Sequence, residues 1–240
     1  MTEATHTVKS YEQELERLRG MMARMGGLVE RQTAQAVKAV VDGDEEAAIE
    51  APDLDPEVDE LEREAEALAI RILALRSPMA IDLREIVAAL KITGDLERIG
   101  DYAASIARRA LKLDMDGGIS LIGLRSMGRL VQDNLRRAID ALATRDRDLA
   151  VAVWQSDTAV DELYTAMFRE LMTYMMEDPR NIGSCIHLLF VAKNLERIGD
   201  HTTNIAERIY YAVTGEMLPA VRPRGGLGPQ QTPPAIPDAR

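Results

Sequence analysis

The stretch LERIGD at residues 96–101 returns letter for letter at residues 195–200, and the predicted architecture follows from this repetition. A second segment, VDEL at residues 58–61, returns at residues 160–163. The separation between equivalent positions changes only from 102 to 99 residues, which one three-residue gap explains. Chance matches do not keep such order, so we interpret the chain as two tandem copies of one unit.

Each copy has the pattern of three amphipathic helices. In the first copy, a capping box at Ser10 to Gln13 precedes an apolar stripe whose spacing alternates between three and four residues. A second helix is expected to open near Asp55-Pro56, because proline suits the first turn of a helix. Ser77-Pro78 breaks the chain after it. A third helix is expected from about Ile81 to Leu113.

The apolar stripes follow a near-heptad period, which favours antiparallel helices that pack at shallow angles. We therefore predict an all-α fold of two three-helix bundles in tandem, over residues 8–115 and 119–217, joined near residues 114–120. One elongated six-helix bundle is the alternative. Residues 218–240 are rich in proline and glycine and poor in apolar side chains, so we predict that they form a disordered tail.

The composition excludes several classes of protein. The 240-residue chain carries a net charge of −11 and shows no basic footprint, so we expect no nucleic-acid partner. The acidity suits cations or basic protein surfaces, and ordinary solubility explains it equally well. A single cysteine, Cys185, excludes an internal disulfide framework. With no stretch of 18 apolar residues and no signal-like N-terminus, we expect a cytoplasmic protein.

The repeated motif contains an acidic pair with helical spacing, Glu97 and Asp101 in the first copy and Glu196 and Asp200 in the second. Carboxylates four residues apart share one helix face and repel each other by roughly 0.2–0.5 kcal/mol. The glycine inside each motif costs about 1 kcal/mol relative to alanine in a helix. Both copies keep the repelling carboxylates and the destabilising glycine, so the motif requires a functional explanation.

A second acidic pair has the same spacing, at Asp55 and Asp59 in the first copy and at Asp157 and Asp161 in the second. If the second helix packs beside the third, each copy gathers four carboxylates. Such oxygen-rich clusters suit hard cations such as Mg²⁺, Ca²⁺ and Mn²⁺, and carboxylates also bind iron.

The helical phase predicts where these carboxylates lie. Glu97 falls about 140° from the centre of the apolar stripe of its helix, and Asp101 falls almost opposite the stripe. Asp59 is displaced from its own stripe by about 130°. We therefore expect a partly hydrated metal site on the outer surface of each bundle. A plain solvated face is the alternative, because acidic residues on exposed helix faces are common.

Motifs of common enzyme classes are absent from the sequence. There is no Walker loop, no Gly-x-Gly-x-x-Gly and no Gly-x-Ser-x-Gly. None of His6, His187 and His201 follows a glutamate at the spacing found in di-iron helical bundles. We predict a protein that is not an enzyme. A carboxylate-cluster metalloenzyme and a purely structural helical scaffold are the alternatives.

Three further segments join LERIGD in resembling one known family. They are PMAIDLR at residues 78–84, DHTTNIAE at residues 200–207 and VTGE at residues 213–216. On these motifs the chain resembles the PhoU family of phosphate-specific transport system accessory proteins. The likeness covers roughly residues 8–217, which is nearly everything except the proline-rich tail.

The resemblance implies a function. Members of the family act as negative regulators of the phosphate-starvation (Pho regulon) response and modulate phosphate uptake. They do so by contacting the ATP-binding subunit of the phosphate ABC transporter and its sensor histidine kinase. The resemblance thus implies a cytoplasmic homodimer that is peripheral to the membrane only through its partners.

The resemblance also implies metal clusters, with iron, zinc, manganese and magnesium as candidate ions. The family's acidic motifs match eight residues here, namely Glu97, Asp101, Glu196, Asp200, Asp55, Asp59, Asp157 and Asp161. The copies differ at three nearby positions, which are Asp95 against Asn194, Tyr102 against His201, and Ser105 against Asn204. The resemblance therefore leads us to expect that the two sites bind metal differently.

Overall fold

The computed structural model describes residues 2–113 and 118–219, with side chains from residue 10 onward. The first copy consists of α1 (Thr2–Val41), α2 (Glu45–Asp53), α3 (Asp55–Arg76) and α4 (Ala80–Ala110). The second consists of α5 (Ile122–Thr144), α6 (Arg147–Glu177), the 3-10 helix η1 (Pro179–Asn181) and α7 (Ile182–Thr214). These described residues contain no strand, and none of their helices is long and apolar enough to cross a membrane. The predicted all-α fold is confirmed.

The second helical segment of each copy begins at an aspartate. Asp44 caps α2, because its carboxylate accepts a hydrogen bond from the backbone N–H of Ala47 at 2.9 Å. Asp146, the equivalent residue in the second copy, caps α6 by accepting from two backbone N–H groups in its first turn. The duplication therefore extends to the signal that starts these helices.

The second segment of the first copy is divided, whereas its counterpart is continuous. Pro52 lies in the last turn of α2, and the chain starts again as α3 at Asp55. In the second copy Trp154 occupies the position of Pro52, and its indole Nε1 donates to Glu207 Oε1 at 3.1 Å. α6 therefore runs unbroken.

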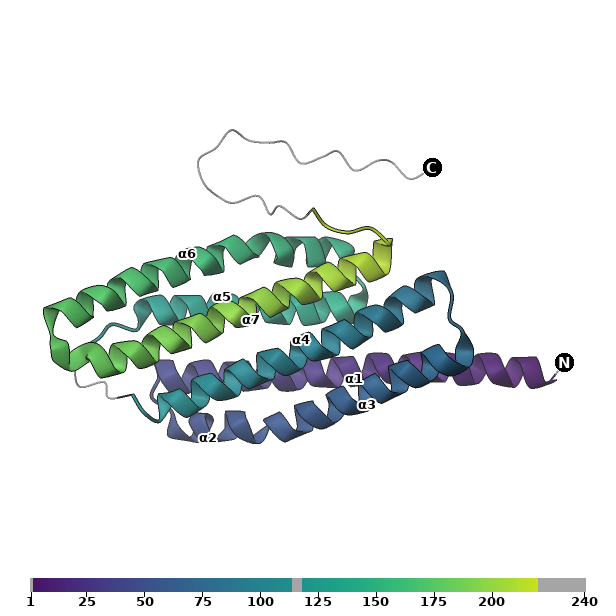
Figure 1. The fold of residues 1–240 in the computed structure, drawn as a ribbon, viewed down its shortest axis with the longest axis horizontal. Coiled ribbons are helices and arrows are strands. Elements are labelled where there is room, and N and C mark those ends of the chain that lie inside the picture. Colours follow the sequence, from purple (N-terminus) through teal and green to yellow (C-terminus); the bar gives the residue numbers. More distant parts are fainter. Residues whose placement is uncertain (1, 114–117, 220–240) are drawn as a thin grey trace.

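α1 is longer than the sequence predicts. The capping box places a helix start at Ser10, but α1 begins at Thr2. No proline or glycine occurs in residues 2–10, so that segment contains no residue that breaks a helix. Figure 1 shows the N-terminal part of α1 extending past the other helices of its bundle.

The two bundles lie side by side (Figure 1). α4 and α7 run antiparallel along the boundary between them, and α1 packs against α5. The predicted pair of three-helix bundles is confirmed, and one apolar core continues through both of them, from Leu18 in α1 to Ile198 in α7. The junction at residues 114–117 and most of the predicted tail, residues 220–240, lie outside the described residues.

Two glycines allow α1 and α5 to approach closely. A Cβ atom on Gly128 would lie 2.7 Å from Cγ1 of Val37, and one on Gly26 would lie 3.1 Å from Cγ2 of Ile139. Gly26 and Gly128 are equivalent in the duplication, and so are Val37 and Ile139. The two contacts are therefore reciprocal. Together with the antiparallel α4 and α7, they relate the copies by an approximate two-fold axis.

A charged group also ties the copies together. Glu85 of α4 is only 9% exposed and accepts hydrogen bonds from Arg19 of α1 and from Arg145, which follows α5. In each case a guanidinium Nη2 lies 2.9 Å from Glu85 Oε2. Burial by itself would raise the pKa of Glu85, but the two arginines outweigh it and hold the pKa below its usual range.

Candidate functional site

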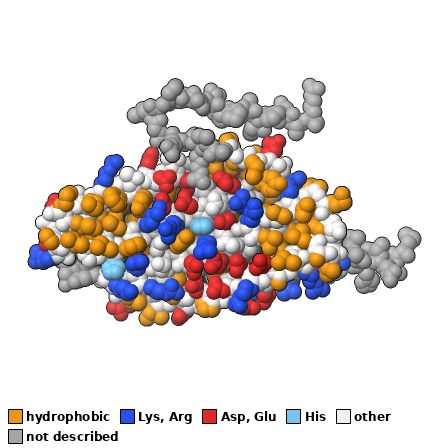
Figure 2. Space-filling view, in the orientation of Figure 1, with side chains coloured by type: hydrophobic (Ala, Val, Ile, Leu, Met, Phe, Trp, Pro, Cys, Tyr) orange, Lys and Arg blue, Asp and Glu red, His pale blue; other side chains and the backbone are white. Residues whose placement is uncertain are grey.

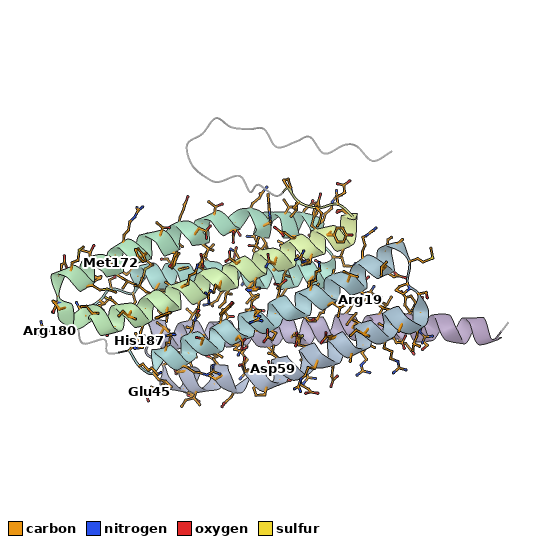
Figure 3. The ribbon with its side chains drawn as sticks, viewed as in Figure 1. Arg19, Glu45, Asp59, Met172, Arg180 and His187 are labelled. Atoms are coloured by element: carbon orange, nitrogen blue, oxygen red, sulfur yellow. The ribbon has the colours of Figure 1, made fainter. Side chains whose placement is uncertain are left out.

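α3 and α4 bring together four carboxylates, which we call the first cluster: Asp55, Asp59, Glu97 and Asp101. Burial, followed by the charge of Asp101, raises the pKa of Glu97. Burial also raises the pKa of Asp55. The hydrogen bond from Gln32 opposes this shift, and the charges of Asp101 and Asp59 add to it. Figure 3 shows Asp59 on α3. The packing of the second helical segment beside the third gathers the carboxylates as the sequence predicts.

Gly100 makes room for the first cluster. Gln32 Oε1 lies 3.0 Å from the position that a Cβ atom on Gly100 would occupy, and Asp55 Oδ1 lies 3.5 Å from it. Gln32 Nε2 also donates to Asp55 Oδ1 at 2.9 Å, and the Arg108 guanidinium lies 3.8 Å from Asp55 Oδ2. The glycine of the repeated motif therefore permits the close approach of one side chain from α1 and one from α3.

The second cluster consists of the equivalent residues on α6 and α7: Asp157, Asp161, Glu196 and Asp200. Burial, followed by the charges of Glu196 and Asp161, raises the pKa of Asp200. Glu196 forms an ion pair with Lys193, one turn earlier in α7. The two clusters thus have the same kinds of carboxylate at equivalent positions, but their cationic neighbours differ.

The exposure of the carboxylates follows the prediction only in part, because Asp55, Glu97, Glu196 and Asp200 are half-buried and Asp157 is buried. Asp59, Asp101 and Asp161 are exposed, as expected for an outer surface. Asp157 is only 4% exposed, so the expectation that the clusters point away from the core is wrong for this residue. The reason is that Asp157 lies on the side of α6 that packs against α7. There Thr203 Oγ1 donates to Asp157 Oδ1 at 3.0 Å.

The negative charge of the clusters favours a bound cation, but the positions of the carboxylates do not form a coordination site. Burial and repulsion between carboxylates raise the pKa of Glu97 and Asp200, and a bound cation would stabilise the ionised forms. Within residues 2–113 and 118–219, no three His, Cys, Asp or Glu side chains converge on a point that could hold a metal ion. The donor chemistry therefore fits a hard cation, and coordination would require the carboxylates to turn toward one another.

Sequence reasoning missed the polar neighbours of the clusters. Gln32 is fully buried, although it continues the apolar stripe of α1 three residues after Val29. Its equivalent in α5, Asn134, is 3% exposed. Buried polar groups need hydrogen-bond partners. The buried polar residue in the apolar stripe of α1 was therefore the available signal that α1 reaches the first cluster.

Polar contacts join α4 to α7 along the boundary of the two copies. Asn194 Nδ2 donates to Ser105 Oγ at 3.1 Å, and Asn204 Nδ2 donates to Asp95 Oδ1 at 3.4 Å. These contacts are reciprocal, because Asp95 is equivalent to Asn194 and Ser105 to Asn204. His201 Nδ1 lies 2.8 Å from Asp95 Oδ1. The differing positions near the repeated motifs are therefore those at which the copies contact each other.

Fold and site together define a class, namely a duplicated helical-bundle protein in which each copy presents a cluster of four carboxylates. A family model, described as the PhoU domain, matches residues 22–110 and matches again at residues 124–209. The chain belongs to the PhoU family, which confirms the resemblance found in its sequence.

Curated relatives and solved structures extend over most of the chain. A phosphate-specific transport system accessory protein PhoU homolog of Caulobacter vibrioides is 51% identical over 226 residues, covering 93% of this chain and 97% of the relative. The PhoU homolog of Zymomonas mobilis is 47% identical over 225 residues, covering 93% and 94%. The crystal structure of PhoU from Pseudomonas aeruginosa has a TM-score of 0.82 at 44% identity, covering 86% of this chain and all of that chain.

A more distant structure retains the same fold. The phosphate transport system regulatory protein PhoU from Streptococcus pneumoniae is 29% identical and has a TM-score of 0.80, covering 87% of this chain and 99% of that chain. The arrangement of the two bundles is therefore shared with relatives that are 44% and 29% identical to this chain.

Proposed function

We propose that this chain is an accessory protein of a phosphate transport system, where it regulates phosphate uptake and restrains the phosphate-starvation (Pho regulon) response. The observation that carries the proposal is its likeness to the Caulobacter vibrioides accessory protein, which is 51% identical over 93% of this chain. Both copies match the family model, so the proposal concerns the whole duplicated surface.

In this proposal the chain is a cytoplasmic adaptor and not an enzyme. Its partners are the ATP-binding subunit of the phosphate ABC transporter and the sensor histidine kinase, and it reaches the membrane only through them, as a homodimer. One feature of the structure bears on the metalloenzyme alternative, which needs its carboxylates beside a pocket. A cavity of about 460 Å³ lies between α1, α4, α5 and α7, and its lining includes none of the eight carboxylates. The clusters therefore lie outside that cavity.

Deletion of the gene is expected to raise the expression of phosphate-starvation genes several-fold in phosphate-rich medium, because the repressing adaptor is gone. An alkaline phosphatase reporter measures the effect. The wild-type chain is expected to restore repression, whereas Glu97→Gln/Glu196→Gln is expected to restore it only in part. Glu12→Gln/Asp140→Asn, which removes two exposed acids away from the clusters, is the charge-matched control. Unchanged reporter activity and phosphate uptake in the deletion strain would refute the proposal.

We also propose that the two clusters bind metal ions, with iron, zinc, manganese and magnesium as candidates. The support lies in the charge of the clusters. Carboxylates whose pKa values are raised by burial and by one another gain most from a cation that offsets their repulsion. Because several carboxylates are exposed, the ions would remain partly hydrated and their affinity would be modest.

Elemental analysis of the purified, tag-free protein tests the metal proposal. After incubation with salts of the four metals and removal of excess ions, near-stoichiometric metal is expected in the wild-type chain and in the Glu12→Ala/Asp140→Ala control. Asp101→Ala/Asp200→Ala is expected to lose most of it, because each cluster loses one ligand. Equal metal content in both variants, or none in the wild-type chain, would reduce the clusters to a charged docking surface.

A further inference from the structure

The side-chain amide of Gln32 in α1 has one end hydrogen-bonded and the other end unpaired. Its Nε2 donates to Asp55 Oδ1 at 2.9 Å, and this hydrogen bond determines which end of the amide is the oxygen. The oxygen, Oε1, is buried and has no hydrogen-bond partner among the residues that the structure describes. Because buried polar atoms are almost always paired, this oxygen is available to a ligand.

The unpaired oxygen faces the repeated motif of α4. Gln32 Oε1 lies 3.0 Å from the position that a Cβ atom on Gly100 would occupy, and Asp55 Oδ1 lies 3.5 Å from the same point. In the sequence, Glu97 precedes Gly100 by three residues and Asp101 follows it directly. The amide oxygen of α1 therefore borders the same stretch of α4 that carries two carboxylates of the first cluster.

The oxygen atoms around the first cluster extend from the interior to the surface. Gln32 is fully buried. The side chains of Asp55 and Glu97 are 18% and 24% exposed, whereas Asp59 and Asp101 are exposed residues. Figure 2 shows acidic side chains grouped over α3 and α4, where Figure 3 places Asp59. The amide oxygen therefore lies at the inner side of the cluster.

The arginines near the first cluster leave this role open. Arg98 lies 3.6 Å from Glu97 Oε2, and Arg108 lies 3.8 Å from Asp55 Oδ2. The two arginine side chains are 60% and 59% exposed, and ion pairs this exposed contribute little, so a divalent cation can replace them. The Gln32 amide is neutral, so it offers a further oxygen without adding to the repulsion between the carboxylates.

The ligand set identifies the class of cation. It consists of four carboxylates and one amide oxygen, which are all hard ligands. Mg²⁺, Mn²⁺ and Ca²⁺ suit sets of this kind, whereas structural zinc sites are built mainly from nitrogen and sulfur ligands. We propose that Gln32 Oε1 is a fifth ligand of the first cluster and that this cluster binds a hard divalent cation. The inference rests on the proposal that the clusters bind metal, and it adds a ligand from outside the acidic motifs.

The corresponding place in the second copy is built differently. Asn134 is equivalent to Gln32 and is one methylene shorter, and its Oδ1 is likewise buried without a partner in the described part of the chain. The atoms closest to a Cβ atom on Gly199 belong to Val160, whereas in the first copy Gln32 supplies the closest atom. We therefore expect the fifth ligand in the first cluster only.

Mn²⁺ is the probe, because binding removes the electron paramagnetic resonance signal of the free ion. The titrations use the full-length Asp161→Ala/Asp200→Ala chain as parent, so that the first cluster is measured with the second disabled. Gln32→Met has a side chain of similar length without an oxygen, and it is expected to weaken Mn²⁺ binding at least about tenfold. Gln32→Glu keeps an oxygen there but cannot donate to Asp55, and it is expected to bind Mn²⁺ at least as tightly as the parent. Zn²⁺ affinity is expected to change little in Gln32→Met.

Gly100→Ala tests the same oxygen without removing a ligand. The added Cβ atom would lie 3.0 Å from Gln32 Oε1 and shift it, so Mn²⁺ binding is expected to weaken several-fold. Gly94→Ala is the matched control on α4, since the nearest atom to its Cβ is Glu62 Oε1 at an ordinary contact distance of 3.9 Å. Thermal unfolding without metal checks that each variant folds. Added Mn²⁺ is expected to raise the melting temperature of Gln32→Glu more than that of Gln32→Met.

Four results would overturn the inference. Undiminished Mn²⁺ binding by Gln32→Met would show that Oε1 is not a ligand, while metal binding by the carboxylates would stand. Equal losses in Gln32→Met and Gln32→Glu would mean that Gln32 acts only by holding Asp55 through its N–H. An equal loss of Zn²⁺ affinity would remove the preference for a hard cation. A parent chain that binds no Mn²⁺ would overturn the inference together with metal binding at the first cluster. In every case the reporter assay on the deletion strain judges regulation of the starvation response independently.

Discussion

Replacing Gly128 with leucine is expected to destabilise the protein by about 2 kcal/mol, although leucine is a better helix former than glycine. Even a Cβ atom at this position would lie 2.7 Å from Cγ1 of Val37, which is branched at its β carbon and cannot turn its methyl groups away freely. Overpacking of a core typically costs 1–3 kcal/mol or more and outweighs the gain of about 1 kcal/mol in helix propensity.

Thermal and urea unfolding measure this loss. The melting temperature is expected to fall by about 5 °C, given roughly 2–4 °C per kcal/mol for a chain of this size. Gly20→Leu is the matched control, since an added Cβ at Gly20 meets no atom within 4 Å, and we expect that variant to be no less stable than the wild-type chain. Val37→Ala should recover part of the loss caused by Gly128→Leu. A Gly128→Leu protein as stable as the Gly20→Leu control would show that α1 and α5 are not held together by this contact.

Glu85→Gln is expected to cost about 2 kcal/mol at neutral pH. The substitution removes the carboxylate that accepts hydrogen bonds from Arg19 and Arg145, and it leaves two guanidinium groups beside a neutral amide. Hydrogen bonds to charged groups contribute about 1.5–3 kcal/mol each when buried, and the partial exposure of both arginines reduces that value here.

The effect of Glu85→Gln should depend on pH in a defined direction. Because the arginines lower the pKa of Glu85 in the folded state, the ionised carboxylate stabilises the fold fully above the ordinary glutamate pKa of about 4.3. This stabilisation is lost as the pH falls through the lower folded-state pKa. Urea unfolding at neutral and acidic pH should therefore show the difference between the two proteins shrinking on acidification.

The control for this prediction is Glu64→Gln, which removes an exposed ion pair with Arg17 and is expected to change stability little at any pH. A difference between the wild-type chain and Glu85→Gln that stays constant down to acid unfolding would contradict an ionic role for Glu85. It would assign the loss to packing of the side chain instead.

The duplication made much of this molecule predictable. Equivalent apolar stripes predicted six helical segments in two bundles. Packing of the second helix beside the third, the condition set for a four-carboxylate cluster, brings Glu97 and Asp101 near Asp55 and Asp59. The break at Pro52 was not predicted, because proline near the end of one helix and proline at the start of the next give similar signals. The start of α1 was placed too late, because the capping sequence at Ser10 was interpreted as a helix start. It lies inside α1, which continues through it.

Part of the candidate site could not be predicted from one helix at a time. The burial of Asp157 depends on how α6 is rotated against α7, which periodicity along a single helix does not specify. The contact of Gln32 with Asp55 crosses from α1 to α3, so it depends on the packing of three helices. Both residues occupy positions where side chains from different helices meet, and only the assembled fold determines such positions.

The reciprocal contacts of Gly26 and Gly128 give the chain the interface of a homodimer whose two subunits have become covalently joined. In a true homodimer every substitution is present twice, so a change at the boundary must suit both of its occurrences. Here each position can change alone, as Asp95 and Asn194 illustrate by making different contacts at equivalent places. Joining the copies also holds each at high effective concentration near the other, so one half can specialise while their association is maintained.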